Sequence, residues 1–352
     1  MTSEEFLNLQ TELLSITPEA LMRAGALIRA GQLVAFPTET VYGLGANALD
    51  ADAVRSIFEA KGRPGDNPLI VHISAMEQLA PLIAGEPSPM ARALMDACWP
   101  GPMTLIFPKS DAVPSAVTAG LDTVAVRFPA HPTARALIDA ARRPIAAPSA
   151  NRSGRPSPTT ARHVYEDMAG RIPMILDGGA CDVGLESTVI DATGEVPRVL
   201  RPGGITPERI AGICGGVRVD DAVMRPLKPG ERPRSPGMKY RHYAPTGALT
   251  IFEGEDDAVS AAIRERYDAA LAEGKRPLIL ALEAHLPEYG ARRALSLGAD
   301  AGAMAHAIFA RLRDADAMGA DVIFSEAVAS DGIGLAVMNR LGRAAAFHIE
   351  KV

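Results

Sequence analysis

The chain has 352 residues, of which 47% are hydrophobic and 22% are charged, so its composition predicts a globular protein with two domains of ordinary size. Its formal net charge of −6 argues against broad neutralisation of a nucleic-acid backbone, so we expect at most transient contact with tRNA. The three cysteines form no CxxC pair, the acidic start lacks signal-peptide features, and no apolar run is long enough to cross a bilayer. We therefore expect a cytoplasmic protein that contacts no membrane.

The N-terminal half alternates helix signals with short apolar runs. Thr17 as N-cap and Pro18 in the first turn predict a helix that ends near Gly31. Asp50 predicts the cap of a second helix, and Ser74 with Glu77 has the spacing of a capping box for a third. The remaining predictions are a helix over 131–141 and strands over 33–36, 69–73, 103–107, 124–128, 145–147, 187–191 and 198–200. Such alternation is typical of an α/β domain.

Residues 225–242 differ in composition from the rest. They contain four prolines and two glycines, which argue against a regular helix or a central strand, and six basic residues against one acidic residue. A solvated linker is one interpretation; because aromatic residues are interspersed, we favour a linker that folds back onto a phosphate-bearing ligand. After Pro245 the pattern predicts strands over 249–252, 278–282 and 322–325 and helices over 258–272 and 301–314. The predicted organisation is a catalytic domain over 14–205, a linker over 206–245 and a smaller domain over 246–352.

Several familiar catalytic motifs are missing from the sequence. It contains no GxxxxGK[ST] loop, no GxGxxG after a predicted strand, no HExxH and no GxSxG. Its histidines and cysteines show no zinc-ligand spacing, so we expect no metal site made of protein side chains alone.

Polar segments instead follow the predicted strands, where α/β sheets often bind ligands. Lys61 and Arg63 end a predicted helix, where they could bind a polyanion or simply favour the helix terminus. Arg127 interrupts an apolar strand, and a buried arginine requires an anionic partner such as a ligand carboxylate. His72 also lies in a strand, where a histidine is more often a core residue than a ligand. Individually these signals are weak; together they favour positioning of substrates and stabilisation of phosphate charge.

Taken together, the segments resemble the YrdC-like domain of threonylcarbamoyl-AMP synthases in their long, two-domain form. They are PTETVYGLG (37–45), KGRP (61–64), DNPLIVH (66–72), VAVRFPAHP (124–132), PSAN (148–151), GLESTVID (184–191), LRPG (200–203), the linker SPGMKYRHYAP (235–245) and GLAVMNRL (334–341). The order of so many motifs makes coincidence a poor explanation.

The resemblance implies a YrdC-like twisted-sheet α/β domain, a proline-rich basic linker and a smaller Rossmann-like α/β domain. It implies a nucleotidyltransferase that joins L-threonine, bicarbonate and ATP, with Mg²⁺ on the triphosphate, into threonylcarbamoyl-AMP and pyrophosphate. A tRNA-modifying threonylcarbamoyl transferase complex then uses this product for the adenosine beside the anticodon.

The resemblance also assigns roles to residues. The catalytic tetrad consists of Lys61, Arg63, Ser149 and Asn151. The threonine pocket consists of Thr40, Tyr42, His72, Arg127, Ala147 and Ser187. The nucleotide is expected to contact Arg63, Asn67, Thr123, Ser149, Asn151, Ser157, Arg201 and, from the linker, Tyr243.

Two other functions fit weaker subsets of these features. An RNA-binding module without catalysis would use the basic segments alone, although the acidic net charge argues against it. Another carbamoyl-adenylate-forming enzyme, acting on carbamoyl phosphate, would share the N-terminal motifs.

Overall fold

The computed structural model describes residues 9–226 and 243–352, which form two compact units. Within these residues the second unit comprises 154–156, 224–226 and 243–352, and the first comprises the rest. The start of the predicted linker, after residue 206, forms regular structure in the first unit. Residues 227–242, which carry most of the basic and proline-rich sequence, lie outside the described part.

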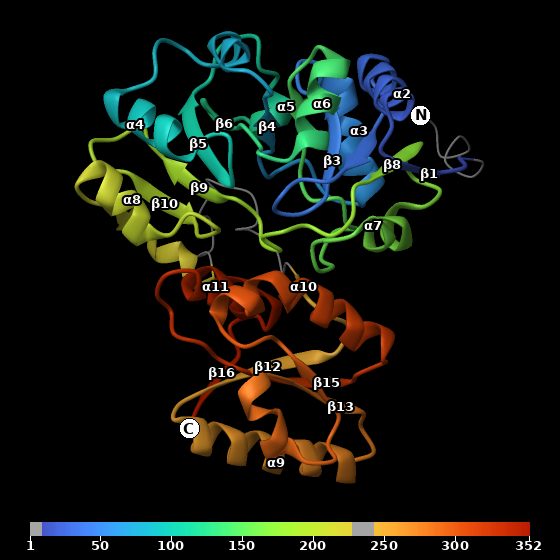
Figure 1. The fold of residues 1–352 in the computed structure, drawn as a ribbon, viewed down its shortest axis with the longest axis vertical. Helices are drawn as coiled ribbons and strands as arrows, with labels where there is room; N and C mark the ends of the chain where they lie inside the picture. Colours follow the sequence, from blue (N-terminus) through green and yellow to red (C-terminus); the bar gives the residue numbers. More distant parts are fainter. Residues whose placement is uncertain (1–8, 227–242) are drawn as a thin grey trace. The chain divides into compact units, whose positions relative to one another are not determined.

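The first unit is built on a mixed sheet of eleven strands within the described residues (Figure 1). In sheet order the strands are β1 (Glu12–Ser15), β8 (Met174–Asp177), β2 (Val34–Phe36), β3 (Gly43–Asn47), β7 (Ile145–Ala146), β4 (Ile70–His72), β6 (Thr123–Arg127), β5 (Met103–Pro108), β9 (Thr188–Asp191), β10 (Arg198–Arg201) and β11 (Arg218–Val219). The helices are α2 (Pro18–Arg29), α3 (Ala51–Lys61), α4 (Pro89–Cys98), α5 (Ser115–Thr118), α6 (Pro132–Ala141), α7 (Ala161–Met168) and α8 (Pro207–Cys214), with short 3₁₀ turns η1 (Met76–Gln78), η2 (Ala80–Leu82) and η3 (Asp221–Val223). The predicted α/β class is confirmed.

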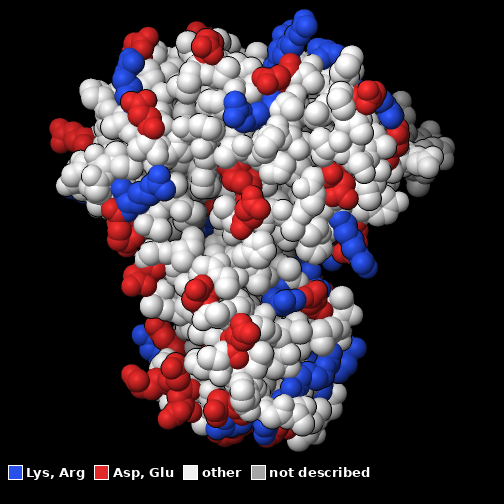
Figure 2. All heavy atoms as spheres, viewed as in Figure 1, with Lys and Arg blue, Asp and Glu red and all other residues white. Residues whose placement is uncertain are grey.

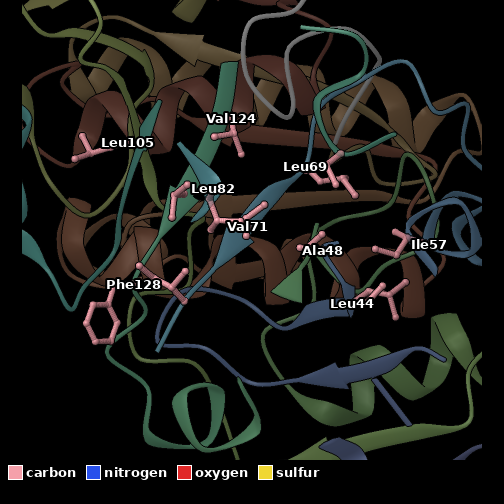
Figure 3. Close-up of a cluster of buried hydrophobic side chains, with 14 of the residues drawn as sticks. Leu44, Ala48, Ile57, Leu69, Val71, Leu82, Leu105, Val124 and Phe128 are labelled. Atoms are coloured by element: carbon pink, nitrogen blue, oxygen red, sulfur yellow. The ribbon is translucent and has the colours of Figure 1, made fainter. Parts of the chain in front are cut away.

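Apolar side chains cover the two faces of this sheet unequally. The main core, part of which Figure 3 shows, lies between the sheet and the helices on one face. Every second residue of a strand points to this face, as Val71, Leu105 and Val124 do on their own strands. On the other face, α2 and α6 pack over β2, β7 and β8. Gly25 allows this packing, because a Cβ there would lie 2.6 Å from the carbonyl carbon of Ala140. The second core therefore sits over one end of the sheet.

Strand β3 was not predicted, because the sequence around it reads as a polar turn. Its residues are nonetheless mostly buried, and it pairs antiparallel with β2 and β7. A Cβ on Gly45 would lie 2.8 Å from Ile145 Cγ2 and 2.9 Å from Phe36 Cε1, so the neighbouring side chains occupy the space that a larger residue would need. Glycine here serves close packing inside a strand.

The predicted capping box at Ser74 and Glu77 is wrong. Only the 3₁₀ turns η1 and η2 follow, and Pro81 lies within the second of them. The Ser74 hydroxyl instead donates to Asp139 Oδ1 at 2.5 Å, while its backbone N–H donates to Gln78. The predicted caps Thr17 and Asp50 do accept hydrogen bonds from the first turns of α2 and α3.

The second unit contains a parallel sheet of five strands among its described residues. In sheet order they are β14 (Ala294–Ser296), β13 (Pro277–Ala281), β15 (Val322–Glu326), β12 (Ala248–Glu253) and β16 (Ile349–Lys351). The connecting elements are α9 (Asp256–Ala272), η4 (Glu283–Tyr289), α10 (Ala301–Ala317) and α11 (Gly334–Ala344). Helix α9 covers one face, and α10 and α11 cover the other (Figure 1).

The smaller α/β domain is thus confirmed, with one distinctive feature in its strand order. In the dinucleotide-binding order the first strand lies beside the second. Here β15 lies between β12 and β13, so the first and fourth strands have exchanged places.

The surface shows no dominant charge on the face in Figure 2, where described acidic and basic side chains are interspersed. This agrees with the modest net charge of −6. In the described ranges, no helix has the length and apolar character needed to cross a membrane.

Candidate active site

One row of residues crosses five neighbouring strands of the N-terminal sheet. Backbone pairing places His72 of β4 opposite Arg127 of β6, and Arg127 opposite Thr104 of β5. The row continues through Val189 of β9 to Arg201 of β10. Residues directly opposite one another on paired strands point to the same face. Two guanidinium groups, an imidazole and a hydroxyl therefore share one surface of the sheet.

An apolar floor lies beside this row on the same face. Ile70, Ala125 and Ile106 are paired with one another and stand two residues from the row on their strands. With Val189 and Leu200 they form a small buried cluster that is separate from the main core. The face therefore combines a charged row with an apolar surface, as ligand sites commonly do.

Arg127 is fixed by two side chains from the segment between β2 and β3. The residue is 3% exposed; its Nη2 lies 2.8 Å from Glu39 Oε1, and its Nη1 donates to Thr40 Oγ1 at 2.8 Å. Glu39 also accepts hydrogen bonds from the backbone N–H groups of Ala130 and His131, next to the start of α6. Burial would raise the pKa of Glu39, but the charge of Arg127 and hydrogen bonds from Arg127 and the Ala130 backbone hold it below its ordinary value. The guanidinium is therefore held in one orientation.

Ser187 joins the row from the segment just before β9. Its Oγ lies 2.7 Å from Thr104 Oγ1 and accepts a hydrogen bond from Arg201 Nη2 at 3.1 Å. Arg201 Nε also donates to the Ser187 carbonyl at 3.1 Å. At Gly203 a Cβ would come within 2.5 Å of Glu186 O and of the Thr188 backbone nitrogen, so this glycine permits the close approach. The second guanidinium is thus tied to the predicted substrate residue Ser187.

A second polar group links the end of α3 to the segment after β7. Lys61 is 3% exposed, and its Nζ donates to the carbonyl oxygens of Ser149 at 2.5 Å and Asn151 at 2.6 Å. Ser149 Oγ donates to Asn151 Oδ1 at 2.5 Å. Both carbonyl acceptors are neutral, so these hydrogen bonds do not cancel the positive charge of Lys61. Three of the four predicted tetrad residues therefore form one network.

The other predicted residues of the first unit occupy varied positions. Arg63 lies with its guanidinium carbon 6.0 Å from the centre of the Phe58 ring, and Asn67 is fully buried before β4. Ser157 Oγ donates to Glu186 Oε1 at 2.6 Å. Thr123, the first residue of β6, is half-buried.

Two residues predicted for the threonine pocket, Ala147 and Tyr42, make hydrogen bonds to the backbone of neighbouring segments. The backbone N–H of Ala147 donates to Ile70 O at 2.9 Å. The Tyr42 hydroxyl donates to Gly179 O at 2.7 Å and accepts from the Gly178 backbone at 3.2 Å. Burial raises the pKa of Tyr42, so it remains a neutral hydrogen-bonding group. These contacts fix the backbone after β7 and β8.

Tyr243 belongs to the second unit. Its ring centre lies 5.0 Å from that of Phe309 on α10, and the guanidinium carbon of Arg340 on α11 lies 5.8 Å from it. The contact predicted for Tyr243, with a nucleotide, stays a prediction.

His72 remains neutral in the folded protein at ordinary pH. Its burial and the nearby charge of Arg127 lower the pKa of the imidazole to about 3, and its Nδ1 lies 3.2 Å from Ile70 O. An uncharged ring beside Arg127 adds hydrogen-bonding capacity without adding charge.

This depressed pKa predicts a contribution to acid sensitivity. Between about pH 6.5 and 3 the unfolded chain binds a proton at this position and the folded chain does not, so stability falls as the pH falls. In His72→Gln, the free energy of unfolding should depend less steeply on pH in this interval, by about 1.4 kcal/mol per pH unit. Denaturant titrations between pH 6.5 and 4 measure this slope; an identical slope in both proteins would contradict the prediction.

Sequence reasoning missed Glu39 and Thr104. Glu39 lies in the quoted PTETVYGLG segment, and an acidic residue beside Thr40 could have suggested a partner for Arg127. Thr104 gave no signal, because only strand register reveals that it stands opposite Arg127.

Fixed cations and hydroxyls on one face of an α/β sheet are typical of proteins that bind an anionic ligand by preformed electrostatics. Within the described ranges, no three His, Cys, Asp or Glu side chains are grouped so that they could hold a metal ion.

Comparisons with known proteins match both units. A family model described as "Telomere recombination" matches residues 26–203, and one described as "Threonylcarbamoyl-AMP synthase, C-terminal domain" matches residues 205–346. A threonylcarbamoyl-AMP synthase of Pyrococcus abyssi is 50% identical over 94% of this chain and 95% of its own length. One from Bacillus subtilis is 47% identical over 98% of each chain. The crystal structure of P. abyssi Sua5 complexed with L-threonine is 48% identical, with a TM-score of 0.91 over 98% of this chain and 99% of that one.

The chain therefore belongs to the threonylcarbamoyl-AMP synthase family, in its long, two-domain form.

Proposed function

We propose that this protein is a nucleotidyltransferase that forms threonylcarbamoyl-AMP and pyrophosphate from L-threonine, bicarbonate and ATP. Relatives at 50% and 47% identity carry the name of this activity, and a solved relative binds L-threonine. The observation that carries the proposal is the buried Arg127, which Glu39 and Thr40 hold beside an apolar floor. A guanidinium group beside an apolar surface suits a ligand that has a carboxylate and a short aliphatic side chain. Threonine has both.

The reaction uses a nucleophile that the substrate supplies. The threonine amine adds carbon dioxide, derived from bicarbonate, and loses a proton to give a carbamate. A carbamate oxygen then attacks the α-phosphorus of ATP, and the bond to pyrophosphate breaks. The protein's part is to hold the two substrates together and to stabilise negative charge on the phosphates. Arg127, Thr40, His72 and Ser187 suit the amino-acid end of this arrangement.

The phosphates of ATP are assigned to Lys61, Arg63, Ser149 and Asn151. The Lys61 network joins a cation to the small polar segment after β7, and such segments can wrap phosphate oxygens. Mg²⁺ would enter with the triphosphate, where it neutralises charge, because this ion is commonly held by substrate phosphates and water. Arg201, Asn67, Thr123, Ser157 and Tyr243 are assigned to the nucleotide on the family resemblance.

The product is a reactive mixed anhydride, so it must pass to an acceptor before water destroys it. We assign it to a threonylcarbamoyl transferase complex acting on tRNA in the cytoplasm.

Pyrophosphate release from ATP tests the proposal. Purified protein with Mg²⁺ and bicarbonate should release pyrophosphate when L-threonine is added, and much less with serine, alanine or no amino acid. Release without threonine would point to another adenylate-forming reaction, such as one on carbamoyl phosphate. No release from correctly folded protein, combined with salt-sensitive RNA binding, would favour an RNA-binding module.

Glu39 is expected to act on threonine binding through Arg127. In Glu39→Gln the guanidinium keeps Thr40 but loses its ion pair, so the KM for threonine should rise by about tenfold, equivalent to about 1.4 kcal/mol. The KM for ATP should stay within about twofold, because Glu39 acts through Arg127, whereas the Lys61 network joins the end of α3 to the segment after β7. Steady-state kinetics with each substrate varied in turn measure the difference, and equal increases for both substrates would show a general structural defect instead.

A further inference from the structure

The second unit contains an open pocket that the proposed reaction does not use. It has a volume of about 450 Å³, within the range of small-molecule sites. Its lining includes the ends of β12 and β15, at Phe252, Glu253 and Glu326, and the residues that follow them. Every residue that lines it belongs to this unit.

Strand order explains why a pocket forms at this point. β12 and β15 are adjacent and parallel, but the chain leaves β12 for α9 on one face and β15 for α11 on the other (Figure 1). Adjacent strands whose connections diverge in this way leave a crevice at their carboxyl ends, where open α/β sheets bind ligands. β12 and β15 have exchanged places relative to the dinucleotide-binding order, but they are still adjacent and their connections still diverge.

The polar lining of the pocket is acidic. Glu326 is 3% exposed, and the exposed residues Glu253 and Asp256 contribute two further carboxylates to the lining. His285 lies between two of these acids, with Nδ1 2.9 Å from Glu326 Oε2 and Nε2 3.7 Å from Asp256 Oδ2. No lysine or arginine is among the described residues that line the pocket. Lys351 pairs with Glu253 at 3.7 Å, but this pair is exposed and therefore weak.

Glu326 is held as a fixed acceptor by three protein groups. Its Oε1 accepts from the Tyr289 hydroxyl at 2.5 Å, and its Oε2 lies 2.9 Å from both the Leu282 backbone nitrogen and His285 Nδ1. A bare metal ion needs several such oxygens at once, and among the described residues no three His, Cys, Asp or Glu side chains are grouped to supply them. An organic cation needs only one carboxylate acceptor, and Glu326 keeps lone-pair capacity beyond its three hydrogen bonds to the protein.

The rest of the lining is apolar, formed by Phe252, Val259, Leu282 and a series of alanines. This combination of a fixed carboxylate, acidic rim and apolar wall disfavours phosphates and carboxylates, which the acids would repel. We infer that the pocket binds a small organic ammonium ion with a short apolar body, making it a second ligand site distinct from that of the proposed reaction.

Calorimetric titration of the full-length protein with butylammonium and 1,4-diaminobutane at physiological ionic strength tests this inference. We expect saturable binding of one molecule per chain, and no binding of butyrate, which has the same apolar body and the opposite charge. Binding should persist with saturating L-threonine, whose own amine occupies the other site. Absence of saturable binding up to about 10 mM, equal binding of butyrate, or competition by threonine would each overturn the inference.

Two variants locate the site. Glu326→Gln should weaken binding by about tenfold or more; because this residue is buried, its folding must be checked by thermal unfolding. Asp256→Asn alters an exposed side chain, should leave the fold intact and should weaken binding severalfold. Glu265→Gln, an exposed acid on the same helix that does not line the pocket, is the matched control and should bind as the unaltered protein does. Unchanged affinity in Asp256→Asn would overturn the assignment.

Discussion

Replacing Arg127 by alanine should raise the threonine concentration needed for half-maximal rate by about 100-fold or more while leaving the KM for ATP nearly unchanged. The loss of a desolvated ion pair to a ligand carboxylate costs about 2–5 kcal/mol, which corresponds to a factor between about 30 and several thousand. The KM for threonine of Arg127→Lys should lie between those of Arg127→Ala and the unaltered protein, because an ammonium group keeps the charge but cannot form the planar fork. Pyrophosphate release with threonine and ATP varied separately measures both constants.

The control for this prediction must separate binding from folding. Arg127→Ala alone leaves Glu39 buried without its ion-pair partner, and a broken buried pair costs about 3–5 kcal/mol of stability. The double variant Arg127→Ala with Glu39→Gln removes the orphaned charge and should recover part of that stability without recovering threonine affinity. Two results would contradict a role for Arg127 in the threonine pocket. One is recovery of both stability and threonine affinity in the double variant, and the other is an equal loss of ATP and threonine binding in that variant.

Replacing Lys61 by alanine should slow formation of the adenylate by about 100-fold or more in kcat, with a smaller effect on either KM. Its charge is expected to stabilise the phosphates as the bond to pyrophosphate breaks, and loss of one preorganised electrostatic group costs about 2.7–4 kcal/mol in the transition state. Single-turnover measurement of pyrophosphate release, with enzyme in excess over ATP, isolates this step.

Lys61 also holds the segment around Ser149 and Asn151, so a structural explanation must be tested beside the catalytic one. Lys61→Met keeps the aliphatic stem but removes the charge and the donors, and Lys275→Ala removes an exposed lysine of the second unit. If the role is catalytic, Lys61→Met should be as slow as Lys61→Ala, while Lys275→Ala keeps full activity. Normal adenylate formation in Lys61→Met would exclude the catalytic role.

Local signals in the sequence were sufficient for much of the fold. Thr17 and Asp50 predicted helix starts because the capping interaction involves only neighbouring residues. The capping box predicted at Ser74 was wrong because the Ser74 hydroxyl bonds to Asp139, 65 residues away, and no local pattern contains that information. Strand β3 failed for a related reason, since its glycines look like turn residues until Phe36 and Ile145 are packed against them.

The candidate site divides in the same way. The sequence identified Arg127 as a buried cation in need of a partner, but not that Glu39 supplies one inside the protein. It placed Ser149 and Asn151 near Lys61 only through family resemblance, whereas the hydrogen bonds join residues 88 and 90 positions apart. The pocket in the second unit had no sequence motif, because it arises from strand order.

The position of β8 has a consequence for how the chain is made. β8 lies between β1 and β2 and pairs with both, and Thr11 is tied to Ile172 beside it. On a ribosome, β1 and β2 therefore emerge long before residues 174–177, the strand that joins them, have been synthesised. Until then the nascent chain exposes Val34, Ala35 and Phe36, which are completely buried in the folded protein. A fragment that stops before residue 174 should consequently depend on chaperones to remain free of aggregates.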